Sequence, residues 1–303
     1  LDYPQYHIIA IHRGLASPEL YSKNDFHIIS LYPLDFEEFL WANAEYALSR
    51  EIRRHFSTLT PLGKELHQKA LSQFYLYLVT GGMPLSVLEY RREKKLLMVP
   101  DIQQKLLELI LGDISSQAPT GMTRHCQNAW LSIPAQLEKS SRRFQYSLIT
   151  KGATAKTYEK PLNWLLRSGY ALACRQTSLH LYPTDCGLCA RTLGVPSYQL
   201  LTGSDTPAAR ACTETFLAQH FTRNGYTLSY WSSGNQAEVP FLLEKEGRHI
   251  AVDYRLTPHQ KTRNLTRFRA EMNTDVEMYL LSVEDFREKE NYHIVPVYAG
   301  FCV

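Results

Sequence analysis

Residues 230–255 read YWSSGNQAEVPFLLEKEGRHIAVDYR, and this stretch decides the fold. Its two arms, residues 237–243 and 249–255, are rich in strand-forming residues, and a charged turn that ends in glycine separates them. This pattern is typical of a β-hairpin. Because acidic residues form strands poorly, Glu238 on the first arm and Asp253 on the second require a reason. Either they lie on an exposed strand face, or they form a cation site at a sheet edge, since hard divalent ions bind carboxylate oxygens.

The segments around the hairpin extend it into an α/β domain. An amphipathic helix is predicted over residues 207–225, and a strand over residues 226–231 leads into the hairpin. A basic helix over residues 259–269 follows, and strands are predicted over residues 277–282 and 294–298. The predicted order through the first of these last strands is therefore α-β-β-β-α-β.

The chain resembles bacterial and archaeal ATPases of the AAA family that carry a C-terminal module called domain of unknown function 4143. The family hairpin has the pattern Trp-Arg-x-x-x-Gly-Ala-Glu-Val-Asp-Phe, then Ile-Pro-Ile-Glu-Val-Lys, which residues 231–241 and 250–255 follow in part. Residues 31–39 resemble the family's Leu-x-Pro-Leu-x-Phe-x-Glu-Phe, and residues 144–158 resemble Phe-x-Tyr-Ser-x-x-x-x-Gly-Ala-x-Ala-x-x-Tyr. The resemblance implies a C-terminal domain like the PD-(D/E)XK nucleases.

In such nucleases, acids on the two hairpin arms hold Mg²⁺ and a lysine follows the second acid. By this resemblance Glu214 is the helix acid, Asp253 is the second acid and Arg255 stands for the lysine, but the first acid falls on Pro240. Proline has no side-chain oxygen and no backbone donor, so it belongs at an edge or a bulge. Glu238 lies about 6.6 Å along the strand and would need a register change to replace it. We therefore expect a degenerate nuclease site made of these residues.

Residues 113–190 are predicted to form a winged-helix-like domain. A helix over residues 129–139 and a helix through residues 161–166 flank a glycine turn, and a strand follows over residues 169–174. The segment is locally basic, and its cations could bind phosphates of DNA. The alternative is a solvated face of a module that packs against protein. The candidate nucleic-acid-binding residues are Arg142, Arg143, Lys151, Lys156 and Lys160, with Arg167 nearby.

The N-terminal part resembles the last strands of an AAA core. Strands are predicted over residues 6–11 and 26–32, followed by a helix that Asp35 caps. Residues 11–13, Ile-His-Arg, depart from the small polar sensor residue that is usual in the family. No G-x-x-x-x-G-K-[ST] phosphate loop occurs in the sequence, which begins with Leu1 rather than Met. We therefore expect an N-terminally truncated fragment that binds no cofactor itself, with ATP and Mg²⁺ bound only in a full-length relative.

The composition of the chain restricts its function less than the motifs do. The net charge of +3 does not by itself favour nucleic acid, and neither an apolar run of membrane-spanning length nor a signal peptide is visible. The six cysteines lack the density of a disulfide framework, so we expect reduced thiols and a cytoplasmic protein. One C-x-x-C pair, Cys186 and Cys189, could supply half a zinc site. The other nearby candidates, Cys174, His180 and Cys212, have irregular spacing, so the sequence does not favour zinc.

The expected architecture is an α/β chain in four parts: an AAA-core remnant (residues 1–45), a helical region (46–112), a winged-helix-like domain (113–190) and a degenerate nuclease-like domain (195–303). Within the helical region, Gly81-Gly82-Met83-Pro84 is predicted to break a helix. The module of unknown function 4143 would span residues 113–303. Three functions remain open from the sequence: a non-catalytic DNA-binding or regulatory module of an AAA-type ATP-binding protein, a Mg²⁺-dependent DNA endonuclease, and a protein-interaction or structural remnant of a truncated gene. Without a phosphate loop or a first nuclease acid, we do not expect this chain to be an enzyme.

Overall fold

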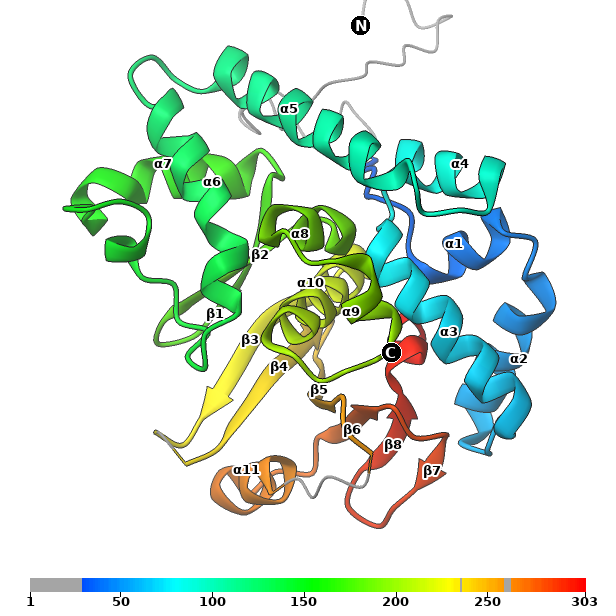
Figure 1. Cartoon of the computed structure of the whole chain (residues 1–303). Helices are drawn as coiled ribbons and strands as arrows, with labels where there is room; N and C mark the ends of the chain where they lie inside the picture. The colour runs from blue at the N-terminus through cyan, green and yellow to red at the C-terminus, as the bar shows by residue number, and fades with distance from the viewer. Residues whose placement is uncertain (1–28, 235, 259–262) are drawn as a thin grey trace, which may run out of the picture.

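The computed structural model describes residues 29–234, 236–258 and 263–303 (Figure 1). The strand predicted over residues 6–11 and the sensor position at residues 11–13 therefore lie outside the described residues. The described part of the second predicted strand, residues 29–32, has no regular secondary structure. The chain enters its first helix where Asp35 accepts a hydrogen bond from the Glu38 backbone, which confirms the predicted cap.

Helices make up the next part of the chain, as the sequence predicts. The predicted break is confirmed, because α3 ends at Thr80 and α4 begins at Pro84. These helices are α1 (Phe36–Ala42), α2 (Tyr46–Thr58), α3 (Lys64–Thr80), α4 (Pro84–Glu93) and α5 (Val99–Gln117).

Three segments meet at the glycine pair in this break. The Leu34 backbone N–H donates to the Gly82 carbonyl at 2.7 Å, and the Tyr77 hydroxyl donates to the Leu34 carbonyl at 2.7 Å. The Gly82 N–H donates to the buried carboxylate of Asp185 at 2.7 Å. A Cβ at residue 82 would lie 1.9 Å from the Leu34 carbonyl oxygen, so only glycine fits there.

Residues 123–183 form a helical pair followed by a hairpin, which we call the α6–β2 unit. The Phe144 backbone N–H donates to the Leu179 carbonyl at 2.8 Å, so the segment between the helices lies beside the hairpin. The helix predicted to begin at residue 129 begins at Thr123, and the second hairpin strand was not predicted. The elements are α6 (Thr123–Leu137), η2 (Tyr146–Leu148), α7 (Ala155–Arg167), β1 (Ala171–Arg175) and β2 (Leu179–Pro183).

Two short helices, α8 (Cys186–Leu193) and α9 (Ser197–Leu201), lead from this unit to the C-terminal domain. The Asp185 carboxylate caps α8 by accepting from the Leu188 backbone N–H at 2.8 Å. Cys186 and Cys189, the C-x-x-C pair, lie in α8 with buried thiols, and all six cysteines are free. The Cys186 thiol donates to the Tyr77 carbonyl at 3.7 Å, so this pair packs against α3.

The C-terminal domain contains the predicted element order α-β-β-β-α-β. Its sheet has the strand order β3-β4-β5-β6-β8-β7, in which the β5–β6 and β6–β8 pairs are parallel and the other pairs are antiparallel. The elements are α10 (Pro207–Arg223), β3 (Thr227–Ser232), β4 (Glu238–Lys245), β5 (Arg248–Arg255), α11 (Asn264–Met272), β6 (Glu277–Ser282), β7 (Arg287–Glu288), β8 (His293–Pro296) and η3 (Val297–Cys302).

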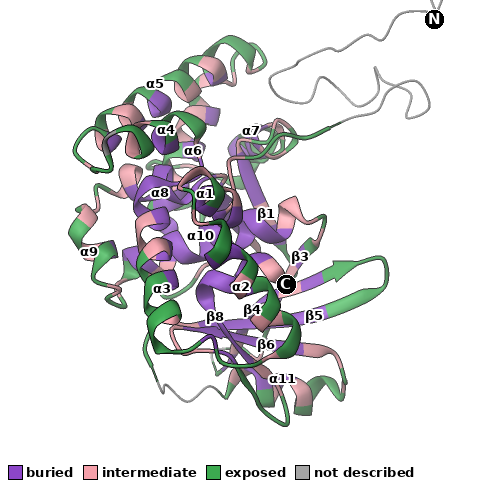
Figure 2. Ribbon diagram, turned by 90° about the vertical axis from the view of Figure 1, so that its right-hand side faces the viewer, coloured by how far each residue is buried: buried purple, intermediate pink, exposed green. Residues whose placement is uncertain are grey.

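The two faces of this sheet contact different helices. On one face Phe241 of β4 packs against Phe221 of α10, with ring centroids 5.4 Å apart. On the other face Trp231 of β3 packs against Phe268 of α11, with centroids 5.5 Å apart. The buried residues concentrate around α10, which lies at the centre of the molecule (Figure 2). Among the described residues, no helix has both the length and the apolar character needed to cross a membrane.

We predict that Gly82→Ala lowers the free energy of unfolding by about 1–3 kcal/mol, because the new Cβ must displace the Leu34 carbonyl. Gly112→Ala is the matched control, since a Cβ at this α5 position meets nothing within 4 Å. In a helix interior the control should be neutral or stabilising by about 0.5–1 kcal/mol. Equal urea midpoints for the two variants would contradict the prediction.

We also predict a loss of stability in acid that depends on His220 of α10. Burial lowers the pKa of this ring to about 3, and its neutral Nε2 accepts from the Phe36 backbone N–H at 3.3 Å. A depressed folded-state pKa means that stability is present above the unfolded value near 6.5 and is lost as pH falls toward 3. At pH 5 the loss from this group should be about 2 kcal/mol.

His220→Gln keeps an acceptor for the Phe36 N–H but cannot titrate. Unfolding in urea at pH 8 and pH 5 should therefore show a smaller acid loss for this variant than for the parent chain. An identical pH dependence for the two proteins would contradict the role of His220.

Candidate functional site

The structure divides the four predicted nuclease-site residues between the two faces of the sheet. Tyr254 of β5 belongs to the core on the α10 side, while Ala251 belongs to the core on the α11 side. Since side chains alternate along a strand, Asp253 lies on the α11 side. Glu214 of α10 and Glu238 of β4 come together on the α10 side.

Arg142, from the segment between α6 and η2, lies between these two acids. Its Nε donates to Glu214 Oε1, and its Nη1 donates to Glu238 Oε1 at 2.9 Å. The Tyr254 hydroxyl donates to Glu214 Oε1 at 2.6 Å, and Arg142 Nη2 lies 3.5 Å from the same hydroxyl. The Glu214 side chain is 2% exposed, that of Arg142 is 21% exposed and that of Glu238 is 29% exposed. The site is therefore a largely buried cluster with one positive and two negative groups.

The electrostatics of the cluster follow from this arrangement. Burial alone disfavours the charged form of Arg142, but the neighbouring Glu214, Tyr254 and Glu238 raise its pKa well above the usual value. Burial raises the pKa of Glu238, and the charge of Glu214 adds to this effect while Arg142 opposes it. Burial and Glu214 also raise the pKa of Tyr254, which stays a protonated donor.

A β-bulge at Pro240 brings Glu238 to this position. Ser229 of β3 pairs with Leu242, and Trp231 pairs with Val239, so two steps along β3 match three steps along β4. The extra residue shifts the register of β4, which confirms that Pro240 belongs at an edge or a bulge. Val239 packs in the core on the α11 side, so Glu238, the next residue, points to the α10 side.

Asp253 has other partners on the opposite face. Its Oδ1 accepts from Arg255 Nη1 at 2.7 Å, and its Oδ2 accepts from Asn264 Nδ2 at 3.2 Å. The side chain is 2% exposed, so this contact is a buried link between β5 and the start of α11. Asp253 and Arg255 therefore do not complete the cluster around Glu214.

The side chains present do not fit a Mg²⁺ site of the nuclease type. Arg142 holds the position between Glu214 and Glu238, Pro240 supplies no oxygen, and Asp253 lies on the other face of the sheet. Throughout residues 29–303, apart from the undescribed positions, no three His, Cys, Asp or Glu side chains are grouped to hold a metal ion.

The predicted nucleic-acid-binding residues also separate into two sets. Arg142 is engaged by two carboxylates and is not available to a phosphate in this structure. Arg143, Lys151, Lys156 and Lys160 are exposed, and in the described chain none of these four forms a salt bridge.

Helix α7 arranges part of this second set on one side. Lys156, Lys160 and Arg167 follow at intervals of four and seven residues, which places them on one exposed helix face. The opposite face, with Tyr158, Pro161, Leu162 and Leu165, is buried. Arg175, at the exposed end of β1 where the hairpin turns, was missed by the sequence reasoning. The unpredicted strand β2 is the reason, since without it Arg175 is not at a turn.

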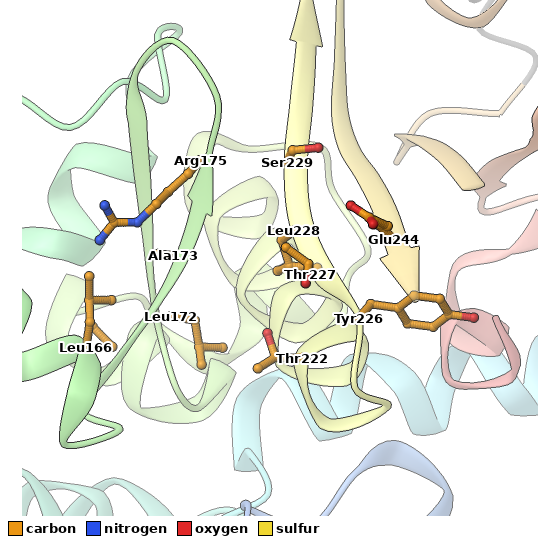
Figure 3. A pocket seen from close by; sticks show the side chains of 11 residues that line it. Leu166, Leu172, Ala173, Arg175, Thr222, Tyr226, Thr227, Leu228, Ser229 and Glu244 are labelled. Atoms are coloured by element: carbon orange, nitrogen blue, oxygen red, sulfur yellow. The ribbon is translucent and has the colours of Figure 1, made fainter. Parts of the chain in front are cut away.

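A cavity of about 430 Å³ lies between β1 and β3, and Arg175 is one of its lining residues (Figure 3). Leu172 lines its β1 wall and Leu228 lines its β3 wall, with Thr222 from the end of α10. None of the predicted nuclease-site residues lines this cavity, so it does not extend the carboxylate cluster.

Part of the chain matches a known family model. A family model described as a domain of unknown function (DUF8612) matches residues 71–199, which run from α3 to α9. No curated protein and no solved structure matches the chain. The matched segment contains both the glycine pair and Asp185, so the contact between them lies within the residues that this model matches.

We predict that Glu214→Gln lowers the free energy of unfolding by about 3–5 kcal/mol, because it leaves Arg142 with a neutral partner at the buried end of its guanidinium. Glu238→Gln should cost at most about 1 kcal/mol, because this carboxylate is partly exposed. Urea unfolding of the two variants measures the difference. A cost for Glu238→Gln equal to or above that for Glu214→Gln would show that the buried end does not dominate.

Proposed function

We propose that this chain is a non-catalytic module that binds double-stranded DNA through the exposed face of α7. The observation that supports the proposal most directly is the set of exposed cations on α7 and the preceding turn that have no carboxylate partner among the described residues. Exposed cations without internal partners are free to replace the counter-ions of DNA phosphates. Helix α7 follows α6 after a connection, residues 138–154, that contains η2, and the β1–β2 hairpin comes next. A second helix followed by a hairpin resembles the arrangement in which a winged helix places a helix in the major groove.

The C-terminal domain then serves as a degenerate nuclease-like domain, which we infer from the resemblance of the hairpin motif and from the element order α10-β3-β4-β5-α11-β6. An active endonuclease is the less favoured alternative, because its cation position is held by Arg142 and its acids lie on different faces.

The same resemblance supports a place for this module in a larger ATP-binding protein of the AAA type, in which nucleotide and Mg²⁺ would bind outside residues 1–303. Sequencing the gene upstream of the codon for Leu1 tests this part of the proposal. An in-frame G-x-x-x-x-G-K-[ST] after a predicted strand is the expected result. A stop codon or unrelated sequence would leave a binding module without an ATPase.

The DNA-binding proposal predicts a strong salt dependence. Binding of a labelled 25-base-pair duplex, followed by fluorescence anisotropy from about 50 to 200 mM salt, should weaken steeply as salt rises. The double variant Lys156→Glu/Lys160→Glu should bind more weakly and should lower the slope of log K against log salt by about 2, since each lost phosphate contact contributes about 0.9.

Arg50→Glu/Lys64→Glu is the matched control, because it makes the same charge change at exposed positions of α2 and α3. The control should keep the slope of the parent chain. Absence of duplex binding at low salt, or equal effects of the two double variants, would overturn the proposal. In that case a protein-interaction or structural role would remain.

A further inference from the structure

We propose that the guanidinium of Arg142 takes the position of a divalent cation between Glu214 and Glu238, and that this internal cation fastens the α6–β2 unit to the C-terminal sheet. This role does not depend on whether α7 binds DNA. It concerns two carboxylates of the predicted degenerate nuclease site, of which the resemblance assigns Glu214 to the Mg²⁺ site as the helix acid.

The contacts of Arg142 support the proposal that its guanidinium takes the place of a metal ion. The guanidinium reaches oxygens of three side chains on three different elements: Glu214 on α10, Glu238 on β4 and Tyr254 on β5. A hard divalent cation would take oxygens of the same kind. Glu214 is also incompletely satisfied, because its buried Oε2 has no hydrogen-bond partner in the structure. The oxygens around Arg142 could therefore accept more hydrogen bonds than its guanidinium donates to them.

The position of Arg142 in the chain explains the fastening. It precedes η2 and α7, while its partners belong to the C-terminal domain. The other side-chain hydrogen bonds across this junction join neutral groups. The Tyr230 hydroxyl contacts the Ser178 N–H at 2.9 Å and the hydroxyls of Thr177 and Ser178, and the Cys174 thiol lies 3.8 Å from the Pro240 carbonyl. Within the described residues, Arg142 makes the only salt bridges that join the α6–β2 unit to the C-terminal domain.

Removal of this side chain leaves two carboxylates beside an empty volume. Their mutual repulsion and the burial of Glu214 disfavour a state without a counter-ion. The variant Arg142→Ala should therefore lose stability and gain affinity for a hard divalent cation, for which Mn²⁺ is a suitable probe. The parent chain should not gain it, because the guanidinium already holds the position.

The test measures thermal unfolding of the full chain with and without 1 mM Mn²⁺, together with Mn²⁺ binding by calorimetry. Without metal, Arg142→Ala should unfold at least about 5 °C below the parent chain. Mn²⁺ should raise the unfolding temperature of this variant by several degrees and should change that of the parent chain little. Adding Glu238→Gln to Arg142→Ala should remove the response to Mn²⁺, because it removes one of the two charged ligands.

Arg143→Ala is the control, since Arg143 is the exposed neighbour in the same segment and forms no salt bridge in the described chain. Its unfolding temperature and its response to Mn²⁺ should match the parent chain. If Arg142→Ala does not fold, Arg142→Gln keeps amide donors for the carboxylates and should show the same response to Mn²⁺. An equal Mn²⁺ response in the parent chain, no response in both Arg142 variants, or full stability of Arg142→Ala would each overturn the proposal.

Discussion

The arrangement of the chain depends on the hydrogen bonds that the buried carboxylate of Asp185 accepts. It accepts backbone hydrogen bonds from Gly82 and from Leu188, so one side chain holds the break after α3 against the start of α8. Burial raises the pKa of this carboxyl group to about 6, although these backbone donors act in the opposite direction. The Leu34 N–H donates a hydrogen bond to the Gly82 carbonyl. The N-terminal helices, the end of the β1–β2 hairpin and the start of α8 therefore meet at one point. Only glycine at residue 82 allows this approach.

A second junction, at Arg142, fixes the α6–β2 unit on its other side. Asp185 joins the unit to the helices through neutral backbone donors, whereas Arg142 joins it to the C-terminal sheet through two charges. Polar groups thus hold the unit at Arg142, within it, and at Asp185, directly after it, and such groups are stable only when their partners are in place. The exposed face of α7 lies on a unit whose orientation is fixed twice, and this favours a binding surface of constant shape.

Local signals predicted much of the fold. The hairpin followed from two β-rich arms around a glycine turn, and the helix break followed from Gly81 and Pro84. Proline chemistry alone placed Pro240 at an edge or a bulge. Contacts between distant residues could not be predicted: Arg142 is 72 positions from Glu214 and 96 positions from Glu238. A basic segment gives no sign of which of its cations turns inward, so Arg142 and its exposed neighbour Arg143 were assigned the same role.

The bulge also explains why the hairpin acids do not lie together, as a cation site between the two arms would require. Side chains alternate with a period of two, so one extra residue in β4 moves Glu238 to the α10 face while Asp253 stays on the α11 face. The acids on the two hairpin arms are thereby separated, and Glu238 lies instead near Glu214, with Arg142 between them. Two neighbouring carboxylates in a buried site need a positive charge, and an arginine of the same chain supplies it at any metal concentration. Because a guanidinium neither coordinates a water nucleophile nor gives up its proton near neutral pH, the exchange that we propose would also remove the means to activate a nucleophile at this site.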